Sequence, residues 1–583
     1  MPEIIGRKTV ALNEVFAENR SMENSEIARM FELIADMREF RGDNAFRVRS
    51  YRNAARTVRD LSQRVEDLVA QGEDLTQLPY VGKSIAEKMR EMVQTGTCRT
   101  LEELRKEIPP ELTELLHVPR LGAQGAKQVH EKLGVSSLAE LRQACEDQRV
   151  RELPGMGAKS EENVLKGIRT LESASGRVLL KEAVEQIAAI GRHLDNCDAV
   201  VHWEPAGSYR RRKETIGDLD ILIKAEDRDA VTQHILHYGA IEEVLGKGEE
   251  KVSVVLGGGL QVDFRYFDAH AFGTALMYFT GSKAHNIAVR QRVQDKGWKL
   301  NEYGLYEDDH RIAGETEEEV YAELGLDWIA PELREGRGEL EAAAEGNLPH
   351  LIESGDIKGD LHCHSTASDG VNSVAEMVQA ARRLGYEYLC IADHSKAVSI
   401  ANGLDAERLQ EHLEHIREVD AAYEDFWLLA GIEVDILKDG TLDLPESLLR
   451  ELDWVTASTH FYLELSEEEM TRRLVAAVET GVVDCIAHPF MRLIGKRDMI
   501  QFDVDRVFEA CRANGVCVEV NAHPERLDLP DIYARHARDM GLGIVLDTDA
   551  HSGADLGLIN YGVGMARRGW CWRRWSWWRW YGW

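Results

Sequence analysis

The sequence has 583 residues, which is long enough for several domains of ordinary size. Hydrophobic residues make up 44% of the chain and its mean hydropathy is −0.35, and without a run of about 18 apolar residues no membrane-spanning helix is expected. The net charge of −32 excludes a uniformly basic nucleic-acid binder, because phosphate backbones are held by lysine and arginine.

The cysteine pattern and the first residues predict the compartment. The nine cysteines are scattered and never spaced Cys-x-x-Cys, which fits a reducing cytoplasm and argues against cysteine-based zinc modules. The first residues lack the basic and then apolar pattern of a signal peptide. We therefore expect a cytoplasmic protein with no membrane partner.

Helical periodicity dominates residues 24–170, where apolar side chains such as Ile27, Phe31 and Ile34 recur three or four positions apart. Three segments of this region each place a glycine turn before a helix: 78–89, 118–129 and 153–164. Backbone N–H groups at the start of such a helix form an anion site that suits a phosphate.

These three turns resemble helix-hairpin-helix modules, which hold nucleic-acid backbones without reading the sequence. The resemblance implies DNA contacts from the turn residues Gly82, Lys83, Gly122, Gly125, Gly155 and Gly157. Tyr80 and Arg120 stand where a glycine is common in the pattern. The basic run 46–60 lies beside the first module in the sequence and adds local positive charge to an acidic chain.

Short β-rich runs follow the helical region, and one of them, IGDLDILI, carries Asp218 and Asp220. The strand period of two places both carboxylates on one face, and such a pair is a common cradle for Mg²⁺ because a cation relieves their repulsion. The alternating run 260–267 offers Asp263 as a third ligand. Three carboxylates can hold two ions about 3.5 to 4 Å apart for reaction at a triphosphate.

Ten residues before the first aspartate lies the pair Gly207-Ser208, followed by the basic run 210–213. A Gly-Ser turn presents a backbone N–H and a hydroxyl to phosphate oxygens, and arginine supplies charge. The whole stretch GSYRRRKETIGDLDILI resembles the DNA polymerase X family, to which polymerase beta belongs. Arg212 stands where polymerase beta has a glycine.

The resemblance continues at YFTGSKAHN, 278–286, and implies a nucleotide-binding pocket opposite the catalytic aspartates. Ser208 and Arg211 would hold the triphosphate, Asn286 would reach the minor-groove edge and Arg290 the template side. The full set of implied nucleotide contacts is Gly207, Ser208, Arg211, Gly217, Tyr278, Phe279, Gly281, Lys283, Asn286 and Arg290.

The small helical domain of these polymerases binds the 5′-phosphate side of a gap, and the resemblance extends that role to Arg47, Lys83 and Lys88. Lys88 matches the lysine that forms a Schiff base with an abasic sugar in polymerase beta. Such a lysine must be partly deprotonated to act as a nucleophile. Ser84 and Arg47 replace two supporting lysines, so lyase chemistry and simple phosphate binding both remain open for Lys88.

From residue 359 to about 565, strand-like and helical runs alternate, which predicts βα units around a largely parallel sheet or barrel. Residues 350–551 hold eleven of the twenty histidines, several at the ends of apolar runs. The carboxyl ends of parallel strands are where βα barrels gather their chemistry. The stretch GDLHCHSTASDG adds His362 and His364 on one strand face, which together predict a metal site.

In order and motif these positions resemble the PHP domain, the polymerase and histidinol phosphatase family, a distorted barrel that hydrolyses phosphoesters with up to three metal ions. The implied ligands are His362, His364, Asp369, His394, Glu433, His460, His488, Asp549 and His551. Mixed nitrogen and oxygen ligands favour Zn²⁺, Mn²⁺ or Fe over Mg²⁺. At the polymerase site the expected ion is Mg²⁺ or Mn²⁺.

The expected fold is multidomain α and α/β, with a helical helix-hairpin-helix N-terminal domain, a nucleotidyltransferase-type palm and thumb, and a C-terminal PHP distorted (β/α) barrel. The expected boundaries are 1–95 for the 8-kDa-like DNA-binding domain, 96–175 for the helix-hairpin-helix fingers, 176–268 for the palm, 269–335 for the thumb, 336–358 for a linker, 359–566 for the PHP domain and 567–583 for an anomalous tail. The tail holds seven of the twelve tryptophans in its last fourteen positions, and an out-of-frame end explains it better than a membrane-active segment.

These features predict a monomeric DNA-directed DNA polymerase that fills short gaps in base excision or end repair. Its substrates would be dNTPs and gapped or nicked DNA with a 5′-phosphate. The PHP domain would act as a 3′–5′ exonuclease, an abasic-site endonuclease or a 3′-phosphatase. The rival hypothesis is a PHP phosphoesterase of a small metabolite such as histidinol phosphate, with an inactive nucleotidyltransferase part. A non-catalytic DNA-end scaffold is a third reading, and template dependence stays open.

Overall fold

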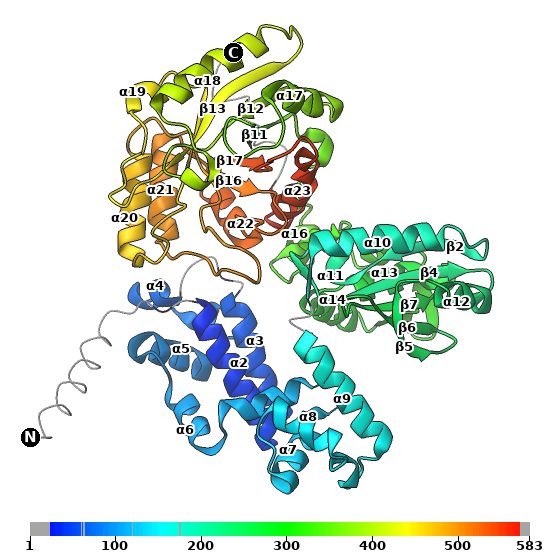
Figure 1. Ribbon diagram of the computed structural model, residues 1–583. Coiled ribbons are helices and arrows are strands. Elements are labelled where there is room, and N and C mark those ends of the chain that lie inside the picture. Colours follow the sequence, from blue (N-terminus) through cyan, green and yellow to red (C-terminus); the bar gives the residue numbers. More distant parts are fainter. Residues whose placement is uncertain are drawn as a thin grey trace, which may run out of the picture. The chain divides into compact units, whose positions relative to one another are not determined.

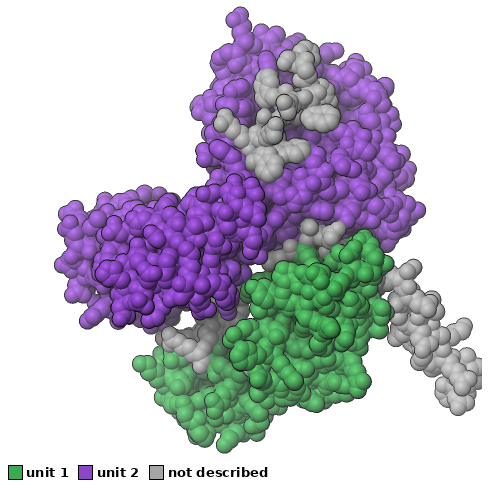
Figure 2. Space-filling view, turned by 180° about the vertical axis from the view of Figure 1, so that it is seen from behind, with its two compact units in different colours: residues 1–176 green, residues 177–583 purple. Residues whose placement is uncertain are grey.

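The computed structural model describes residues 22, 24–59, 61, 65–118, 121–173 and 177–571. The chain divides into two compact units, 1–176 and 177–583, which Figure 2 colours separately. In the described ranges, no helix combines the length and the apolar character that a membrane crossing requires. Most of the expected anomalous tail, residues 572–583, lies outside the described residues.

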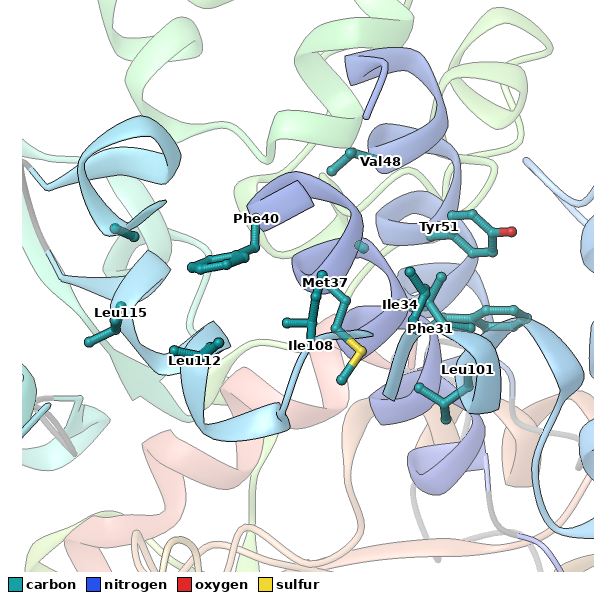
Figure 3. Packing of buried hydrophobic residues seen from close by; sticks show 14 of the residues in the cluster. Phe31, Ile34, Met37, Phe40, Val48, Tyr51, Leu101, Ile108, Leu112 and Leu115 are labelled. Atoms are coloured by element: carbon teal, nitrogen blue, oxygen red, sulfur yellow. The ribbon is translucent and has the colours of Figure 1, made fainter. Parts of the chain in front are cut away.

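The first unit is helical, and its centre is α2 (Asn24–Arg41), which packs along α3 (Ala45–Arg59) (Figure 1). Figure 3 shows Phe31, Ile34 and Met37 of α2 among apolar side chains from other helices of this unit. The remaining elements are α4 (Val65–Ala70), η1 (Leu75–Gln77), α5 (Lys83–Thr95), α6 (Arg99–Glu107), η2 (Pro110–His117), α7 (Gly122–Leu133), α8 (Leu138–Glu146), η3 (Val150–Glu152) and α9 (Ala158–Ser173).

The glycine turns of the first unit precede helices as the sequence predicts. Gly82 caps α5, α7 begins at Gly122, and Gly157 directly precedes α9. Gly122 and Gly155 have positive φ values of 62° and 79°, which glycine adopts without steric cost. Tyr80, which replaces a common glycine, also has a positive φ of 61°, so its backbone carries strain that a glycine would not.

The palm is a five-stranded sheet in the order β2-β4-β7-β6-β5, with α10 (Leu180–Leu194) and α12 (Arg228–Leu236) beside it (Figure 1). β4 and β7 run parallel and pair Asp220 with Asp263, while the other neighbours are antiparallel. The strands are β2 (Val200–Pro205), β4 (Asp218–Ala225), β5 (Ile241–Lys247), β6 (Lys251–Leu256) and β7 (Gln261–Tyr266), and a short pair joins β1 (Val178–Leu179) to β3 (Thr215–Ile216).

The thumb combines helices with a three-stranded antiparallel sheet in the order β10-β9-β8. Residues 336–358, expected to be a linker, include α16 (Glu339–Ala344), whose Leu340 and Ala343 join the buried thumb cluster around Tyr321. The other thumb elements are η4 (Ala269–Ala271), α13 (Phe272–Thr280), α14 (Lys283–Asp295), β8 (Lys299–Asn301), β9 (Gly304–Glu307), β10 (His310–Ala313), α15 (Glu317–Glu323) and η5 (Pro331–Leu333).

The last domain is a seven-stranded parallel sheet whose strands follow one another in chain order from β11 to β17. The first and last strands meet, because the His364 N–H donates to Ala550 O at 2.8 Å and Leu361 N–H donates to the Asp547 carboxylate at 2.8 Å, so the sheet is nearly closed into a barrel. The strands are β11 (Gly359–Cys363), β12 (Tyr388–Ile391), β13 (Trp427–Asp435), β14 (Trp454–Ser458), β15 (Cys485–Ile486), β16 (Cys517–Asn521) and β17 (Ile544–Asp547).

Helices surround this barrel (Figure 1). They are α17 (Val374–Arg383), α18 (Ala406–Asp420), α19 (Glu446–Leu449), α20 (Glu467–Val478), α21 (Val504–Asn514), α22 (Asp531–Asp539) and α23 (Ile559–Arg568). Residues 567–571, the first five of the expected tail, belong to the folded domain, which thus extends beyond the expected boundary at 566. Arg567 and Arg568 end α23, and both Arg568 and Trp570 are buried.

A buried ionic network joins palm and thumb. Glu317 at the start of α15 accepts two hydrogen bonds from Arg334, at 2.6 and 2.9 Å, and two from Arg210, at 2.7 and 2.9 Å. Burial alone would raise the pKa of the Glu317 carboxyl, but the two guanidinium groups outweigh burial and hold that pKa well below its usual range. The carboxylate thus stays charged at neutral pH.

We predict that Glu317→Gln lowers the free energy of unfolding by about 3 to 5 kcal/mol at neutral pH, because it leaves the buried Arg334 and the half-buried Arg210 without their shared carboxylate. The lowered pKa means that the carboxylate contributes stability above its unfolded pKa of about 4.3 and loses it as the pH falls. The deficit should therefore shrink in acid. Urea unfolding followed by tryptophan fluorescence at several pH values measures it.

The matched control is Glu468→Gln, which removes an exposed carboxylate that lies 2.8 Å from Arg506. We expect this change to cost less than about 1 kcal/mol, because exposed ion pairs are screened by water. Equal effects of the two substitutions would contradict the importance assigned to the buried network.

Candidate functional site: a histidine-rich barrel centre and an aspartate-bearing palm

The nine predicted ligands of the barrel lie in or just after its strands. β11 and the residues after it carry His362, His364 and Asp369, and β13 carries Glu433. The others follow β12, β14, β15 and β17 within two to four residues of each strand end: His394, His460, His488, Asp549 and His551. The parallel arrangement brings these side chains to one end of the barrel.

Glu433 is the centre of this set. Its carboxylate lies 2.6 Å from His394 Nδ1, 3.1 Å from His488 Nε2, 3.4 Å from His460 Nε2 and 3.5 Å from His362 Nε2. Burial alone would raise the pKa of Glu433, but the surrounding imidazoles outweigh it and hold that pKa well below its usual range. A buried carboxylate ringed by histidines is a donor set that suits transition-metal ions.

A second part of the set surrounds Asp549 and Asp369. His364 Nε2 lies 3.1 Å from an Asp549 oxygen, and His551 Nε2 lies 3.5 Å from an Asp369 oxygen. Ligand atoms converge within 4.8 Å of one another in three overlapping groups: His364, Asp369, His394 and His551; His362, His364 and Asp549; and His394, Glu433 and His460. The geometry thus provides three adjoining places for a cation.

The residues fit metal ions by a second criterion as well. In the described part of the chain, Nε2 of His362 and Nδ1 of His364 are buried without a hydrogen-bond partner, which is costly unless something else satisfies them. Burial and the neighbouring His394 also lower the pKa of His364 to about 4, so its ring is neutral at physiological pH. Neutral imidazole is the form that binds metals.

Two carboxylates that sequence reasoning missed orient these histidines. Glu519 lies 2.7 Å from His362 Nδ1, and Asp435 lies 2.9 Å from His460 Nδ1, so each leaves the other ring nitrogen for an ion. Asp435 could have been found, because it follows Glu433 at the strand period of two. Glu519 pairs with His362, which is 157 residues away in the chain, so no local sequence pattern predicts this contact.

The three palm aspartates occupy adjoining positions on β4 and β7. Asp218 is exposed, Asp220 is half-buried and Asp263 is 6% exposed. Arg265 donates hydrogen bonds to Asp220 at 2.9 Å and to Asp263 at 2.6 Å, and Lys251 donates to Asp263 at 2.9 Å. Among the described residues, the groups of three or more His, Cys, Asp or Glu side chains whose ligand atoms lie close enough for one ion are all in the barrel, so at the palm side-chain cations balance the aspartates.

Burial and the neighbouring cations shift the pKa values of Asp220 and Asp263 in opposite directions. Burial raises the pKa of Asp220 despite the opposing charge of Arg265. Burial would also raise the pKa of Asp263, but hydrogen bonds from Ser253 and Lys251 and the Arg265 charge lower it. Divalent ions can replace the guanidinium between these carboxylates only if the Arg265 side chain turns away. The sequence did not indicate that Arg265 occupies this place.

The predicted nucleotide contacts gather around the palm–thumb junction. Gly207 has a φ of 64°, and a Cβ there would lie 3.4 Å from an Asp220 oxygen, so the turn approaches the aspartates closely. Asn286 donates to Tyr278 O at 2.7 Å, and Arg290 lies over the Tyr278 ring at 5.1 Å.

Other predicted contacts are engaged within the protein. Phe279 covers Arg265 at 4.3 Å. A Cβ at Gly281 would lie 3.2 Å from Arg211 Nη1, and one at Gly217 would lie 3.0 Å from Arg177 Nη1. Ser208 lies in α11 (Gly207–Arg210), and Lys283 is exposed at the start of α14. Both Ser208 and Lys283 thus lie at the start of a helix, where a phosphate contact is favoured.

In the first unit, the predicted DNA contacts are mostly exposed. Arg47 projects from α3, and Gly82 and Lys83 lie at the start of α5. Lys88 is half-buried and donates to the Ser84 hydroxyl at 2.9 Å and to Ser84 O at 3.1 Å. Gly125 is buried, and a Cβ there would lie 2.8 Å from the Met156 side chain, so this glycine serves packing between the second and third modules.

The chain is 38% identical over 553 residues to the "DNA polymerase/3'-5' exonuclease PolX" of Bacillus subtilis (strain 168), an alignment that covers 94% of this chain and 96% of that protein. The chain belongs to the DNA polymerase X family with a C-terminal PHP domain. Family models match the helix-hairpin-helix domain at 22–98, a helix-hairpin-helix tandem at 96–170, the polymerase beta palm at 177–255, the polymerase beta thumb at 275–335 and the PHP domain at 360–523.

The PHP part of this family X polymerase also matches shorter proteins. A probable phosphatase of Caldanaerobacter subterraneus subsp. tengcongensis is 28% identical over 209 residues, 34% of this chain and 78% of that protein. A probable phosphatase of Acetivibrio thermocellus is 30% identical over 207 residues, 34% of this chain and 81% of that protein. The predicted fold class is confirmed, and both kinds of domain are metal-dependent.

We predict that Glu519→Gln weakens metal binding to the PHP domain by about 10- to 100-fold, because His362 loses the carboxylate that orients its ring. Competition with a calibrated chelator, read out by the metal content of the protein, measures this loss. Glu468→Gln, which changes an exposed carboxylate of the same domain, should leave the affinity unchanged. An unchanged affinity in Glu519→Gln would contradict the orienting role.

Proposed function

We propose that this chain is a DNA-directed DNA polymerase that fills short gaps in base excision or end repair and that its PHP domain trims DNA 3′ ends. The observation that carries the proposal is the pairing of Asp220 with Asp263 across β4 and β7, beside the Gly207 turn. That arrangement occurs in one chain with a histidine-rich barrel centre that offers three groups of ligand atoms. The similarity to a protein named as both polymerase and 3′–5′ exonuclease supports the combination.

In the polymerase reaction, Asp218, Asp220 and Asp263 hold the ions, and Ser208 and Arg211 bind the triphosphate. Bound Mg²⁺ or Mn²⁺ would supply activation of the primer hydroxyl and charge neutralisation of the leaving group. Tyr278, Phe279, Gly281 and Asn286 line the sugar and base of the incoming nucleotide. These further nucleotide contacts complete the pocket: Gly207, Gly217, Lys283 and Arg290.

In the hydrolytic reaction, the nine barrel residues hold up to three Zn²⁺, Mn²⁺ or Fe ions, which would supply an activated water and stabilise the phosphate oxygens. The chain's own contribution is to fix the ligand rings through Glu519 and Asp435. Exonuclease action is the favoured activity. Abasic-site endonuclease and 3′-phosphatase activities use the same phosphoester chemistry.

The proposed partners are dNTPs and gapped or nicked DNA with a 5′-phosphate, bound by a monomer. The helix-hairpin-helix turns hold the DNA backbone through Gly82, Gly122, Gly155 and Gly157, whereas the buried Gly125, also expected there, packs between two modules. The first module's cations Arg47, Lys83 and Lys88 hold the 5′-phosphate, and Lys88 is the proposed nucleophile of any lyase activity. The proposed domains are 1–95, 96–175, 176–268, 269–335 and 359–566.

We predict that Asp218→Ala abolishes primer extension on a 5′-phosphorylated one-nucleotide gap and that His364→Ala abolishes primer shortening, because each removes a ligand from one site. The assay contains dNTPs with Mg²⁺ or Mn²⁺ and resolves primer length on a denaturing gel. Each variant controls the other, since Asp218→Ala should still shorten and His364→Ala should still extend. Extension by Asp218→Ala would refute the polymerase site, and shortening by His364→Ala would refute the hydrolytic one.

The metabolite phosphatase remains the rival hypothesis, and the similarity to the two probable phosphatases is the observation that favours it. Phosphate release from histidinol phosphate distinguishes the two. We expect hydrolysis of a DNA 3′ end to be faster than hydrolysis of histidinol phosphate at equal concentrations. The reverse order, together with no primer extension by the wild-type protein, would support the rival.

A further inference from the structure

The last helix of the PHP domain reaches the loop that we assign to the triphosphate. Arg568, at the end of α23, is buried and donates to three acceptors. These are Arg211 O at 2.7 Å, Glu335 Oε1 at 2.9 Å and Asp531 Oδ2 at 2.6 Å. One arginine thus joins the palm loop, the end of the thumb and the barrel helix α22.

Glu335 is shared between two arginines. The oxygen that accepts from Arg568 Nη1 also accepts from Arg211 Nε at 3.1 Å, and Arg211 Nη1 donates to Thr280 O. The side chain assigned to the triphosphate is therefore held by an internal carboxylate. A triphosphate must compete with Glu335 for that guanidinium.

The charge around Glu335 is unbalanced in favour of cations. The charged groups that act most strongly on its carboxyl are four cations, Arg568, Lys213, Arg211 and Arg337, and Asp531 is a further anion that contacts two of them. Burial would raise the pKa of Glu335, but these cations hold it well below its usual range. The surplus of positive charge at the base of the loop favours an approaching anion.

We propose that Arg568 is a positioning residue for nucleotide binding, which neutralises Glu335 and holds the Arg211 carbonyl so that Arg211 can turn to the triphosphate. The inference rests on the proposed polymerase function. Without Arg568, Glu335 keeps Arg211 as its closest guanidinium partner, and the Arg211 carbonyl loses a buried donor. The PHP domain thereby contributes to the polymerase pocket through its last helix.

Arg567 provides a control that separates a positioning role of Arg568 from a purely structural one. The neighbouring Arg567 also lies on α23 and joins the thumb, because it donates to Glu332 at 2.8 Å and to Ile352 O at 3.0 Å. No hydrogen bond or ion pair that the structure gives for Arg567 reaches Arg211 or Glu335. Arg567→Met therefore removes a comparable contact of the same helix without touching the triphosphate loop.

We predict that Arg568→Met raises the KM for dTTP in gap filling by about tenfold while kcat changes by less than about twofold, because binding rather than chemistry is affected. Arg568→Lys should recover part of this loss, and Arg567→Met should show the wild-type KM. Adding Glu335→Gln to Arg568→Met should return KM to within about threefold of wild type, since the competing charge is gone. Primer shortening by the same preparations verifies that the barrel is folded.

An unchanged KM in Arg568→Met, or a parallel fall of kcat in both arginine variants, would overturn the positioning role. If Arg568→Met does not fold, the single variant Glu335→Gln tests the proposal. It should lower the KM for dTTP by about twofold or more, because Arg211 is released. An unchanged or raised KM would contradict the proposal. Wild-type protein that extends no primer would instead refute the polymerase function itself.

Discussion

The buried carboxylate of Glu433 is the constraint on which the barrel depends. An isolated carboxylate in a protein interior is strongly disfavoured, and Glu433 tolerates burial because four imidazoles approach it from four strands. Two of those imidazoles are in turn oriented by carboxylates, His362 by Glu519 and His460 by Asp435. The strand order, the near closure of the sheet and the positions of the histidines all serve this convergence.

The palm solves a similar electrostatic problem with a different device. Asp220 and Asp263 are balanced by the partly exposed side chains of Arg265 and Lys251, whereas Glu433 of the barrel is buried. A site that exchanges its ions and substrate in each cycle gains from displaceable cations. Buried ligands that carboxylates orient are instead already in place for an ion, and the two halves of this protein show both arrangements.

Local periodicity predicted much of both sites, because a strand's period of two fixes which side chains share a face. This argument found Asp218 with Asp220 and His362 with His364, and it would have found Asp435. Departures from glycine were informative too, since Tyr80 and Arg212 both have positive φ values, of 61° and 55°. Arg265, Glu519 and Arg568 could not be assigned their partners. Most of those pairings join residues 37 to 357 positions apart, and the contact of Arg265 with Asp263 depends on side-chain direction.

The helix that carries Arg568 makes the polymerase domains dependent on the PHP domain for their packing. Trp570, directly after α23, is 7% exposed and belongs to the apolar cluster of the thumb, and Tyr561 packs against the palm cluster. A fragment ended at the thumb would expose an apolar socket and a group of unmatched charges. The boundary between the polymerase and PHP domains is therefore unsuitable for truncation unless the exposed apolar and charged residues are also replaced.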